Sequence, residues 1–151
     1  MISILNFIIA AGLLAILYSY VVGRQILLAS PGNKKMQEIA AAIQEGAKAY
    51  LNRQYRTIAI VGIIILIIIT FALGLWVGIG YFIGAFLSGT AGYVGMLISV
   101  QANVRTAEAS KKGLGAGLNI GFKSGAVTGM LVAGLALLSI AIYYLILLKL
   151  N

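Results

Sequence analysis

Few side chains in this sequence could do acid–base or metal chemistry. The 151 residues include no histidine and no cysteine, and the acidic residues are Glu38, Glu45 and Glu108. Zinc chemistry of the usual kind is therefore excluded, because imidazole and thiolate ligands are missing. Glu38 and Glu45 lie seven positions apart on one helix face and could form a carboxylate pair. An i, i+3 ion pair of Glu45 with Lys48 on a solvated surface is the favoured interpretation.

The positions of the acidic residues also argue against an ion path within these residues. Ion pumps and proton relays hold an acidic side chain at membrane depth, whereas all three acids here lie in charged connections. We find no P-loop pattern, no aspartate cluster that could hold Mg²⁺, and no nucleophile beside a base. The residues therefore predict a chain that has no active site of its own.

Composition indicates which elements carry these side chains. Hydrophobic residues make up 62% of the sequence and charged residues 9%, which excludes an ordinary soluble globule. A transmembrane helix needs about 20 apolar residues, and the central charge-free run, 57–104, is long enough for two. We expect an all-α integral membrane fold with four transmembrane helices in two antiparallel hairpins. They form a single transmembrane unit over residues 1–151, with spans at about 2–23, 34–74, 77–111 and 114–148.

The net charge of +8 is a signal of topology. Six basic and two acidic residues lie in 24–56, four basic and one acidic in 105–123, and none between the second and third spans. Because positively charged loops stay cytoplasmic, both termini are expected outside. The expected surroundings are the lipid bilayer, and no nucleic-acid partner is predicted.

The second predicted helix is longer than a membrane requires. Residues 34–56 have one apolar and one charged face, and no helix breaker separates them from the isoleucine-rich run that follows. A single helix to residue 73 would be about 60 Å long and would project from the bilayer. Its projecting apolar face needs a partner, so the four helices are expected to be part of a larger helical bundle.

Small residues recur at every fourth position in two stretches, which on a helix form one flat stripe. Within lipid, helices associate through close backbone approach, which glycine stripes permit. Helix packing is therefore the favoured interpretation, and the lining of a pore is the alternative. The predicted packing residues are Gly80, Gly84, Ser88 and Gly92 before the charged turn, and Gly117, Gly121, Gly125 and Gly129 after it.

A small group of charges lies where the third and fourth helices are joined. We expect Arg105 and Glu108 to tie the cytoplasmic ends of these helices together. Lys123 lies about two turns into the fourth helix. It can extend to the membrane surface or pair with Glu108 across the hairpin, and a role in ion coupling is a further alternative.

Three patches give the sequence a specific family resemblance. They are IQEGAKAYLNRQY at 43–55, GM at 95–96 with ANVRTA at 102–107, and GAV at 125–127 followed by Gly129. In order and spacing, the chain from residue 1 to about 148 resembles the N-terminal region of the membrane-bound, ion-translocating inorganic pyrophosphatases.

The resemblance implies a large helical membrane enzyme, a homodimer of sixteen-span subunits, which hydrolyses pyrophosphate with Mg²⁺ and pumps H⁺ or Na⁺. In that family the catalytic and gating residues lie on an inner ring of helices, and the first four spans belong to an outer ring. No catalytic motif of the family matches this sequence. The resemblance therefore implies no catalytic, cofactor-binding or metal-binding residue here, and Mg²⁺ is implied only for the complete enzyme.

Two hypotheses follow for function. The first is that the chain is the outer-ring part of an ion-pumping pyrophosphatase and packs against the remaining helices, as a fragment, a truncated gene product or a stand-alone relative. The second is a small, non-enzymatic membrane protein that forms a homo-oligomeric bundle or pore through its glycine stripes. The choice between H⁺ and Na⁺, and dependence on potassium, stay open.

Overall fold

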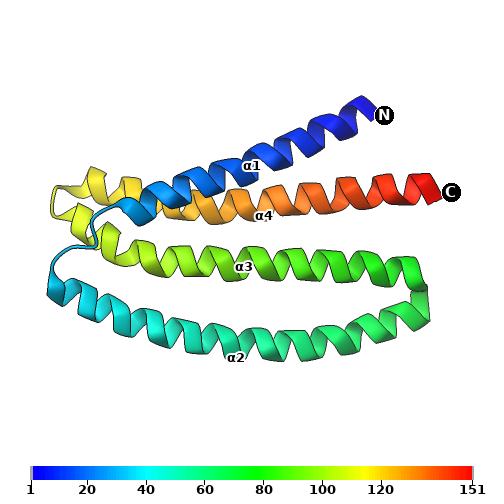
Figure 1. The fold of residues 1–151 in the computed structure, drawn as a ribbon, viewed down its shortest axis with the longest axis horizontal. Helices are drawn as coiled ribbons and strands as arrows, with labels where there is room; N and C mark the ends of the chain where they lie inside the picture. The colour runs from blue at the N-terminus through cyan, green and yellow to red at the C-terminus, as the bar shows by residue number, and fades with distance from the viewer. Residues whose placement is uncertain (1, 151) are drawn as a thin grey trace.

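The computed structural model describes residues 2–150, which fold into four helices (Figure 1). All four are long and apolar enough to cross a membrane. The prediction of an all-α fold with four membrane-length helices is confirmed. The helices are α1 (Ile2–Leu28), α2 (Lys34–Leu73), α3 (Leu75–Ser110) and α4 (Leu114–Leu150).

The connections between helices are short and have clear local causes. The side chain of Asn33 accepts a hydrogen bond from the backbone N–H of Met36 at 3.0 Å and so caps the N-terminus of α2. Gly74 alone separates α2 from α3, with φ at 98°, and Gly113 precedes α4 with φ at 124°. Glycine adopts these positive φ values without the steric cost that other residues have.

Helix α1 continues to Leu28, past the first charged residue, Arg24, which lies inside the helix. Arginine is a good helix former, so its charge does not interrupt the backbone pattern. The continuation is also packed, since Val22 and Ile26 are buried. Together with Ala102 of α3 and Val127 of α4 they form the core cluster of the bundle.

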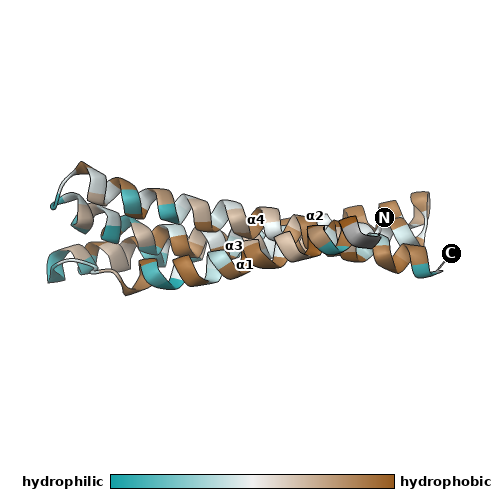
Figure 2. Ribbon diagram, turned by 90° about the horizontal axis from the view of Figure 1, so that it is seen from above, coloured by the Kyte–Doolittle hydropathy of each residue, from teal (hydrophilic) through white to brown (hydrophobic). Residues whose placement is uncertain are grey.

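The four helices lie side by side in a row (Figure 1). Helix α4 packs between α1 and α3, α2 packs against α3, and α1 meets α3 over a short stretch. Within the described chain, α1 and α2 do not touch. Helices α1 and α2, which are consecutive in sequence, thus form the two opposite edges of the row. Figure 2 shows the row nearly edge-on.

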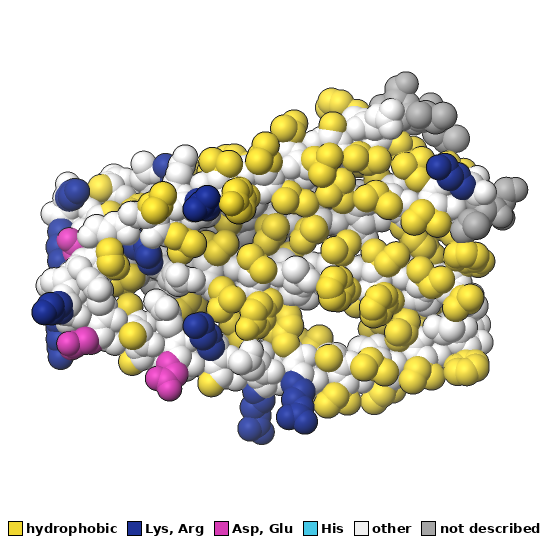
Figure 3. Space-filling model, in the orientation of Figure 1, with side chains coloured by type: hydrophobic (Ala, Val, Ile, Leu, Met, Phe, Trp, Pro, Cys, Tyr) yellow, Lys and Arg dark blue, Asp and Glu magenta, His cyan; other side chains and the backbone are white. Residues whose placement is uncertain are grey.

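Charge gathers at the end of the row that holds the α1–α2 and α3–α4 connections (Figure 3). We call residues 29–56 and 105–123 the basic end. The opposite end holds both termini and Lys149, in the last turn of α4. Helices α2, α3 and α4 contain 40, 36 and 37 residues, well above the roughly 20 that a span needs. Their charged ends therefore extend beyond the apolar layer.

Candidate helix-packing surfaces and the basic end

Helices α1 and α4 approach each other backbone to backbone at Gly12 and Gly134. A Cβ atom added to Gly134 would lie 2.8 Å from the carbonyl oxygen of Gly12, and one added to Gly12 would lie 3.1 Å from the carbonyl oxygen of Gly134. Backbone atoms cannot rotate away from such a contact. Glycine at both positions is therefore what allows these helices to touch.

This pair lies outside the predicted packing rows. Gly134 lies five positions after Gly129, the last residue of the predicted α4 row, and Gly12 lies in a helix without an all-glycine row. A signal was nevertheless present, because small residues also recur every fourth position in α1, at Ala11, Ala15, Ser19 and Gly23. Ala15 and Ser19 are buried.

A buried hydroxyl adds a polar contact to the same interface. The hydroxyl of Ser19 donates to a carbonyl oxygen and lies 3.0 Å from two of them, that of Ala15 in its own helix and that of Val127 in α4. Ser19 is 4% exposed. Because lipid offers no hydrogen-bond partner, this bond across the interface holds α1 in register with α4.

The predicted row on α3 divides between partners. Gly80 faces Tyr143 of α4, whose ring would lie 2.9 Å from an added Cβ, and Gly92 faces the hydroxyl of Tyr55 in α2. A Cβ at Gly84 would meet no neighbour within 4 Å, and Ser88 is exposed. A stripe that is straight along one helix thus meets different neighbours, because α3 lies between two helices.

The α3–α4 contact instead includes a glycine outside the predicted rows. A Cβ added to Gly95 would lie 2.7 Å from the side chain of Thr128. The Thr128 hydroxyl is 3.5 Å from the Gly95 carbonyl oxygen. Gly95 is buried, as is Ala91 one turn before it.

The predicted row on α4 packs at its start and is open further along. Gly117 lies against Ser110, and Gly121 lies within 4 Å of Thr106, both near the turn between α3 and α4. Gly125 and Gly129 have open space where a Cβ would point. The second half of the row is therefore free of contacts within the described bundle.

These open positions continue into a shallow groove between α3 and α4, with a volume of about 220 Å³. Gly84 and Ser88 line it from α3, and Ala136 lines it from α4. Gly125 and Gly129 precede Ala136 by eleven and seven positions, which places all three on one side of the helix. We call Gly84, Ser88, Gly125, Gly129 and Ala136 the small-residue face.

At the basic end, Arg105 caps α1. Its guanidinium donates from Nη2 to the carbonyl oxygen of Leu27 at 2.9 Å and from Nε to that of Ala29 at 3.2 Å. Nη1 donates to the carbonyl oxygen of Gln101 at 2.7 Å. The last carbonyl groups of a helix lack partners within it and carry partial negative charge. Arg105 satisfies two such groups and so fixes the end of α1 to α3.

Glu108 has a different partner from those expected. It pairs with Lys111 within the last turn of α3, with Nζ and Oε2 2.5 Å apart, and this is the ion pair formed among the described residues. The Arg105 side chain bonds to the end of α1 instead. The half-buried Lys123 forms no ion pair within residues 2–150. A partner three positions away costs little conformational entropy, which favours Lys111 over a residue on another helix.

The carboxylates are scattered along the basic end. Glu38 and Glu45 lie on α2 and Glu108 on α3. Residues 2–150 contain no group of three or more histidine, cysteine or acidic side chains that could hold a metal ion. The carboxylates of residues 2–150 therefore form no cluster of the kind that holds metal ions.

Most of the chain is similar to proteins of one known family. The family described as inorganic H⁺ pyrophosphatase matches residues 13–151. A K(+)-insensitive pyrophosphate-energized proton pump of Methanosarcina mazei is 50% identical over 138 residues, which are 90% of this chain and 21% of that protein. A K(+)-insensitive pyrophosphate-energized proton pump 2 of Moorella thermoacetica is 41% identical, over 87% of this chain and 19% of that protein.

A sodium pump is also among the relatives. The putative K(+)-stimulated pyrophosphate-energized sodium pump of Bacteroides thetaiotaomicron is 41% identical over 144 residues, 91% of this chain and 20% of that protein. The chain thus spans about a fifth of the length of these relatives. The resemblance seen in the three sequence patches is confirmed. With its four membrane-length helices, the chain is a multi-pass integral membrane protein that belongs to the inorganic H⁺ pyrophosphatase family.

Proposed function

We propose that this chain forms the N-terminal outer-ring helices of a pump that couples pyrophosphate hydrolysis to the transport of H⁺ or Na⁺, and that the catalytic residues belong to further helices. The observation that carries the proposal is the family match over residues 13–151. Both proton and sodium pumps occur among the relatives, so either ion is compatible with the proposal.

The scarcity of carboxylates supports the division of labour. Phosphoryl transfer needs metal ions and positioned charges around the phosphates. The three glutamates are separated along two helices and form no such cluster in the described chain. We therefore assign pyrophosphate and Mg²⁺ to the remaining helices of the pump and assign no catalytic step to these residues.

Two surfaces support docking to further helices. The small-residue face is open, and small residues are what allow a transmembrane helix to approach closely. On the projecting part of α2, Ile39, Ile43 and Tyr50 are each more than half exposed. Outside the apolar layer such side chains favour contact with protein, so both surfaces fit the remaining helices of one subunit in a homodimeric pump.

The orientation of the chain follows from its charge. We place the basic end on the cytoplasmic side, because lysine and arginine are retained there, and both termini outside. The sequence has no native cysteine, so single cysteines can report the side directly. The cysteine of a Ser30→Cys variant should react with an impermeant maleimide only after the membrane is permeabilised, which exposes the cytoplasmic side. Labelling of intact cells from the outside would show that the orientation is the opposite of the one proposed.

The experiment is a comparison of two membrane preparations. Vesicles carrying this chain alone should show no Mg²⁺-dependent pyrophosphate hydrolysis, and vesicles that also carry the remaining helices of a relative should hydrolyse pyrophosphate and take up ions. Activity from the chain alone would refute the assignment of the active site to other helices. Inactivity of both, with the chain folded as a homo-oligomer, would favour the non-enzymatic bundle.

A further inference from the structure

Exposed tyrosine and arginine side chains form two groups, one on each edge helix of the row. Their members, which we call the tyrosine–arginine belt, are Tyr18, Tyr20 and Arg24 on α1 and Tyr50, Arg53 and Arg56 on α2. The guanidinium of Arg24 lies over the Tyr20 ring, with Cζ 5.9 Å from the ring centroid. Because Tyr20 is one turn further from the basic end, the charge of Arg24 is carried back along α1 to the height of Tyr20.

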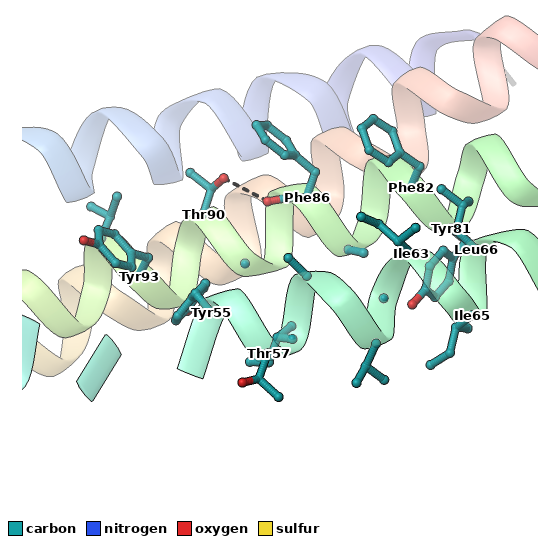
Figure 4. A pocket seen from close by; sticks show the side chains of 17 residues that line it. Tyr55, Thr57, Ile63, Ile65, Leu66, Tyr81, Phe82, Phe86, Thr90 and Tyr93 are labelled. Atoms are coloured by element: carbon teal, nitrogen blue, oxygen red, sulfur yellow. Dashed lines mark hydrogen bonds between the residues drawn. The ribbon is translucent and has the colours of Figure 1, made fainter. Parts of the chain in front are cut away.

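Contacts within the bundle place both groups near the height of Tyr93 on α3. The Tyr93 hydroxyl donates to the side-chain oxygen of Asn52 at 3.1 Å. Its ring meets that of Tyr55 edge to face, with centroids 5.2 Å apart, and Figure 4 shows both rings. On α1, a Cβ added to Gly23 would lie 3.6 Å from Ile98, five positions beyond Tyr93. At 1.5 Å per residue, both groups lie within about 10 Å of Tyr93 along the helix axes.

A second aromatic group lies toward the opposite end of the row. Trp76 is half exposed in the first turn of α3, and the Tyr143 hydroxyl of α4 donates to its carbonyl oxygen. Lys149 follows in the last turn of α4. Trp76 and Tyr93 are 17 positions apart on α3, which is about 26 Å. Tryptophan and tyrosine gather at both faces of a bilayer whose hydrocarbon core is about 30 Å thick, so this spacing matches one membrane.

The part of the bundle between these two levels carries no charge. Lysine, arginine and acidic residues are absent from 2–17, 57–73, 76–93 and 130–148. Helices α2 and α3 leave a slot of about 740 Å³ in this part, lined mostly by aliphatic and aromatic side chains such as Ile58 and Phe86 (Figure 4). All four helices therefore change from apolar to charged at about the same height.

A bilayer placed around the basic end would bury charge. Nζ of Lys111 lies 3.2 Å from Sδ of Met36, so the end of α3 is level with the start of α2. Lys48 lies 12 positions beyond Met36, about 18 Å, and Arg53 lies further along the same helix. A layer about 30 Å thick that began at Lys111 would hold both side chains in hydrocarbon. Neither forms an ion pair in residues 2–150, and an unpaired charge is costly at that depth.

We propose that the tyrosine–arginine belt contacts the head groups of the lipid leaflet on the side of the basic end, with the arginines at the lipid phosphates. The bundle beyond the belt projects from the membrane and includes the Arg105 cap. Gly121 lies within 4 Å of Thr106, which is 13 positions beyond Tyr93. Lys123 therefore lies about 16 Å outside the level of Tyr93, too far from the hydrocarbon for ion coupling at membrane depth.

This assignment shortens two of the spans expected from the sequence. Residues 76–93 of α3 and about 130–148 of α4 cross the lipid, in place of 77–111 and 114–148. Leu118 and Phe122 of α4, which are 61% and 80% exposed, then lie outside the bilayer. The inference concerns depth and does not rest on the pyrophosphatase role, and the opposite orientation of the chain would leave it unchanged.

The test measures depth with single cysteines, since the sequence has none of its own. A spin label is attached at exposed apolar positions on either side of the belt, and the protein is reconstituted in vesicles of phosphatidylcholine and phosphatidylglycerol. Collisions of the label are measured with oxygen, which concentrates in lipid, and with a nickel chelate, which stays in water. The pairs, with the position beyond the belt first, are Leu28→Cys and Leu13→Cys, Ile43→Cys and Ile64→Cys, and Phe122→Cys and Ile140→Cys.

The ratio of the two collision rates should reverse within each pair. Nickel should dominate at the first position of each pair and oxygen at the second. A label at Phe122→Cys that meets oxygen as often as one at Ile140→Cys would place the bilayer around the basic end and overturn the proposal. All six side chains are exposed, so the substitutions remove no buried contact, and circular dichroism confirms the helix content of each variant.

Two double variants test the arginines themselves. A label at Gln54→Cys, beside the belt on α2, should lie at head-group depth. Arg53→Leu with Arg56→Leu removes the charges that hold α2 at this level, and the label should sink by about one helical turn, roughly 5 Å. Lys34→Leu with Lys35→Leu removes the same charge at the start of α2 and should leave the depth unchanged. An unmoved label in the arginine variant, or an equal shift in the lysine variant, would contradict the assignment of the belt to the head groups.

Discussion

At one edge of the helix row, α1 lies against α4 with the backbones of Gly12 and Gly134 in contact. At the other edge, α2 meets α3 through tyrosine rings and leaves a slot of about 740 Å³. Both interfaces lie in the same apolar layer, so a difference in the surrounding solvent cannot explain why one pair of helices packs more closely than the other. The cause is side-chain size: small residues recur along α1, whereas isoleucine fills the apolar part of α2.

The comparison indicates where this fold is rigid and where it adapts. The α1–α4 edge combines backbone contact with the buried Ser19 hydroxyl, and the Arg105 cap additionally ties the end of α1 to α3; each of these requires one specific geometry. The α2–α3 edge is held at its two ends, and between them the side chains of the two helices leave a groove. Substitutions at the first edge should therefore be costly, and substitutions in the slot should be tolerated.

The largest effect is expected at the backbone contact. Gly134→Leu would push α1 away from α4, and we expect a loss of about 3 kcal/mol in the free energy of unfolding, as for severe overpacking. Unfolding in mixed micelles with increasing dodecyl sulfate, followed by circular dichroism, measures it. Gly84→Leu, at an open position, should change the free energy by less than about 0.5 kcal/mol. Equal losses in the two variants would contradict the described α1–α4 contact.

The cap at the basic end should have the next largest effect. Arg105→Met leaves the carbonyl groups of Leu27 and Ala29 without their donor, and we expect a loss of about 2 kcal/mol. Protease cleavage within the 29–33 connection should accelerate accordingly. Lys112→Met, at the same end, should behave as wild type. Arg105→Lys should recover only part of the loss, because an ammonium group lacks the planar fork that contacts several carbonyls.

The buried hydroxyl should contribute less. Ser19→Ala removes the hydrogen bond to Val127, and such bonds between membrane helices contribute about 0.6 kcal/mol on average. The same micelle titration measures the change. Ser139→Ala on α4 is the comparison, and a loss as large there would show that the effect is unrelated to the α1–α4 bond.

The smallest change is expected in the slot. Gly62→Leu meets open space and gains helix propensity, so the free energy of unfolding should stay the same or rise by less than about 1 kcal/mol. The titration is run in lipid-free detergent, so that only contacts within the chain contribute. A loss comparable to that of Gly134→Leu would mean that α2 and α3 pack as tightly as α1 and α4.

Local features of the fold could be predicted from the sequence. Hydrophobic runs predicted the four helices, and in the structure helices begin after Asn33 and Gly113, where the helix boundary depends on a few adjacent residues. The row order could not be predicted, since it depends on contacts between residues far apart in the chain. Arg105 is an example: the pattern predicted that Arg105 and Glu108 tie the third helix to the fourth, whereas two of the Arg105 acceptors lie at the end of α1, 76 and 78 positions away.

The packing residues could be predicted only in part. The spacing of the glycines identifies helices that can pack closely, but it does not say which neighbour each position meets. Gly80 and Gly92 contact different helices, and Gly125 and Gly129 contact none in the described bundle. Gly12 was missed because it lies beside the small-residue row of α1 and not in it. Any small residue permits close approach, so alanine and serine in α1 carry the same packing signal as glycine does.

The most direct test of the proposed role is a chimera. This chain replaces the matching segment of the Methanosarcina mazei proton pump, and pyrophosphate hydrolysis is measured in membranes. The account predicts activity within about tenfold of the parent pump, a difference of about 1.4 kcal/mol in the barrier. It also predicts that Gly134→Leu in the chimera reduces the amount of folded pump. A chimera that is folded and inserted but hydrolyses no pyrophosphate would contradict the claim that these four helices are a working part of such a pump.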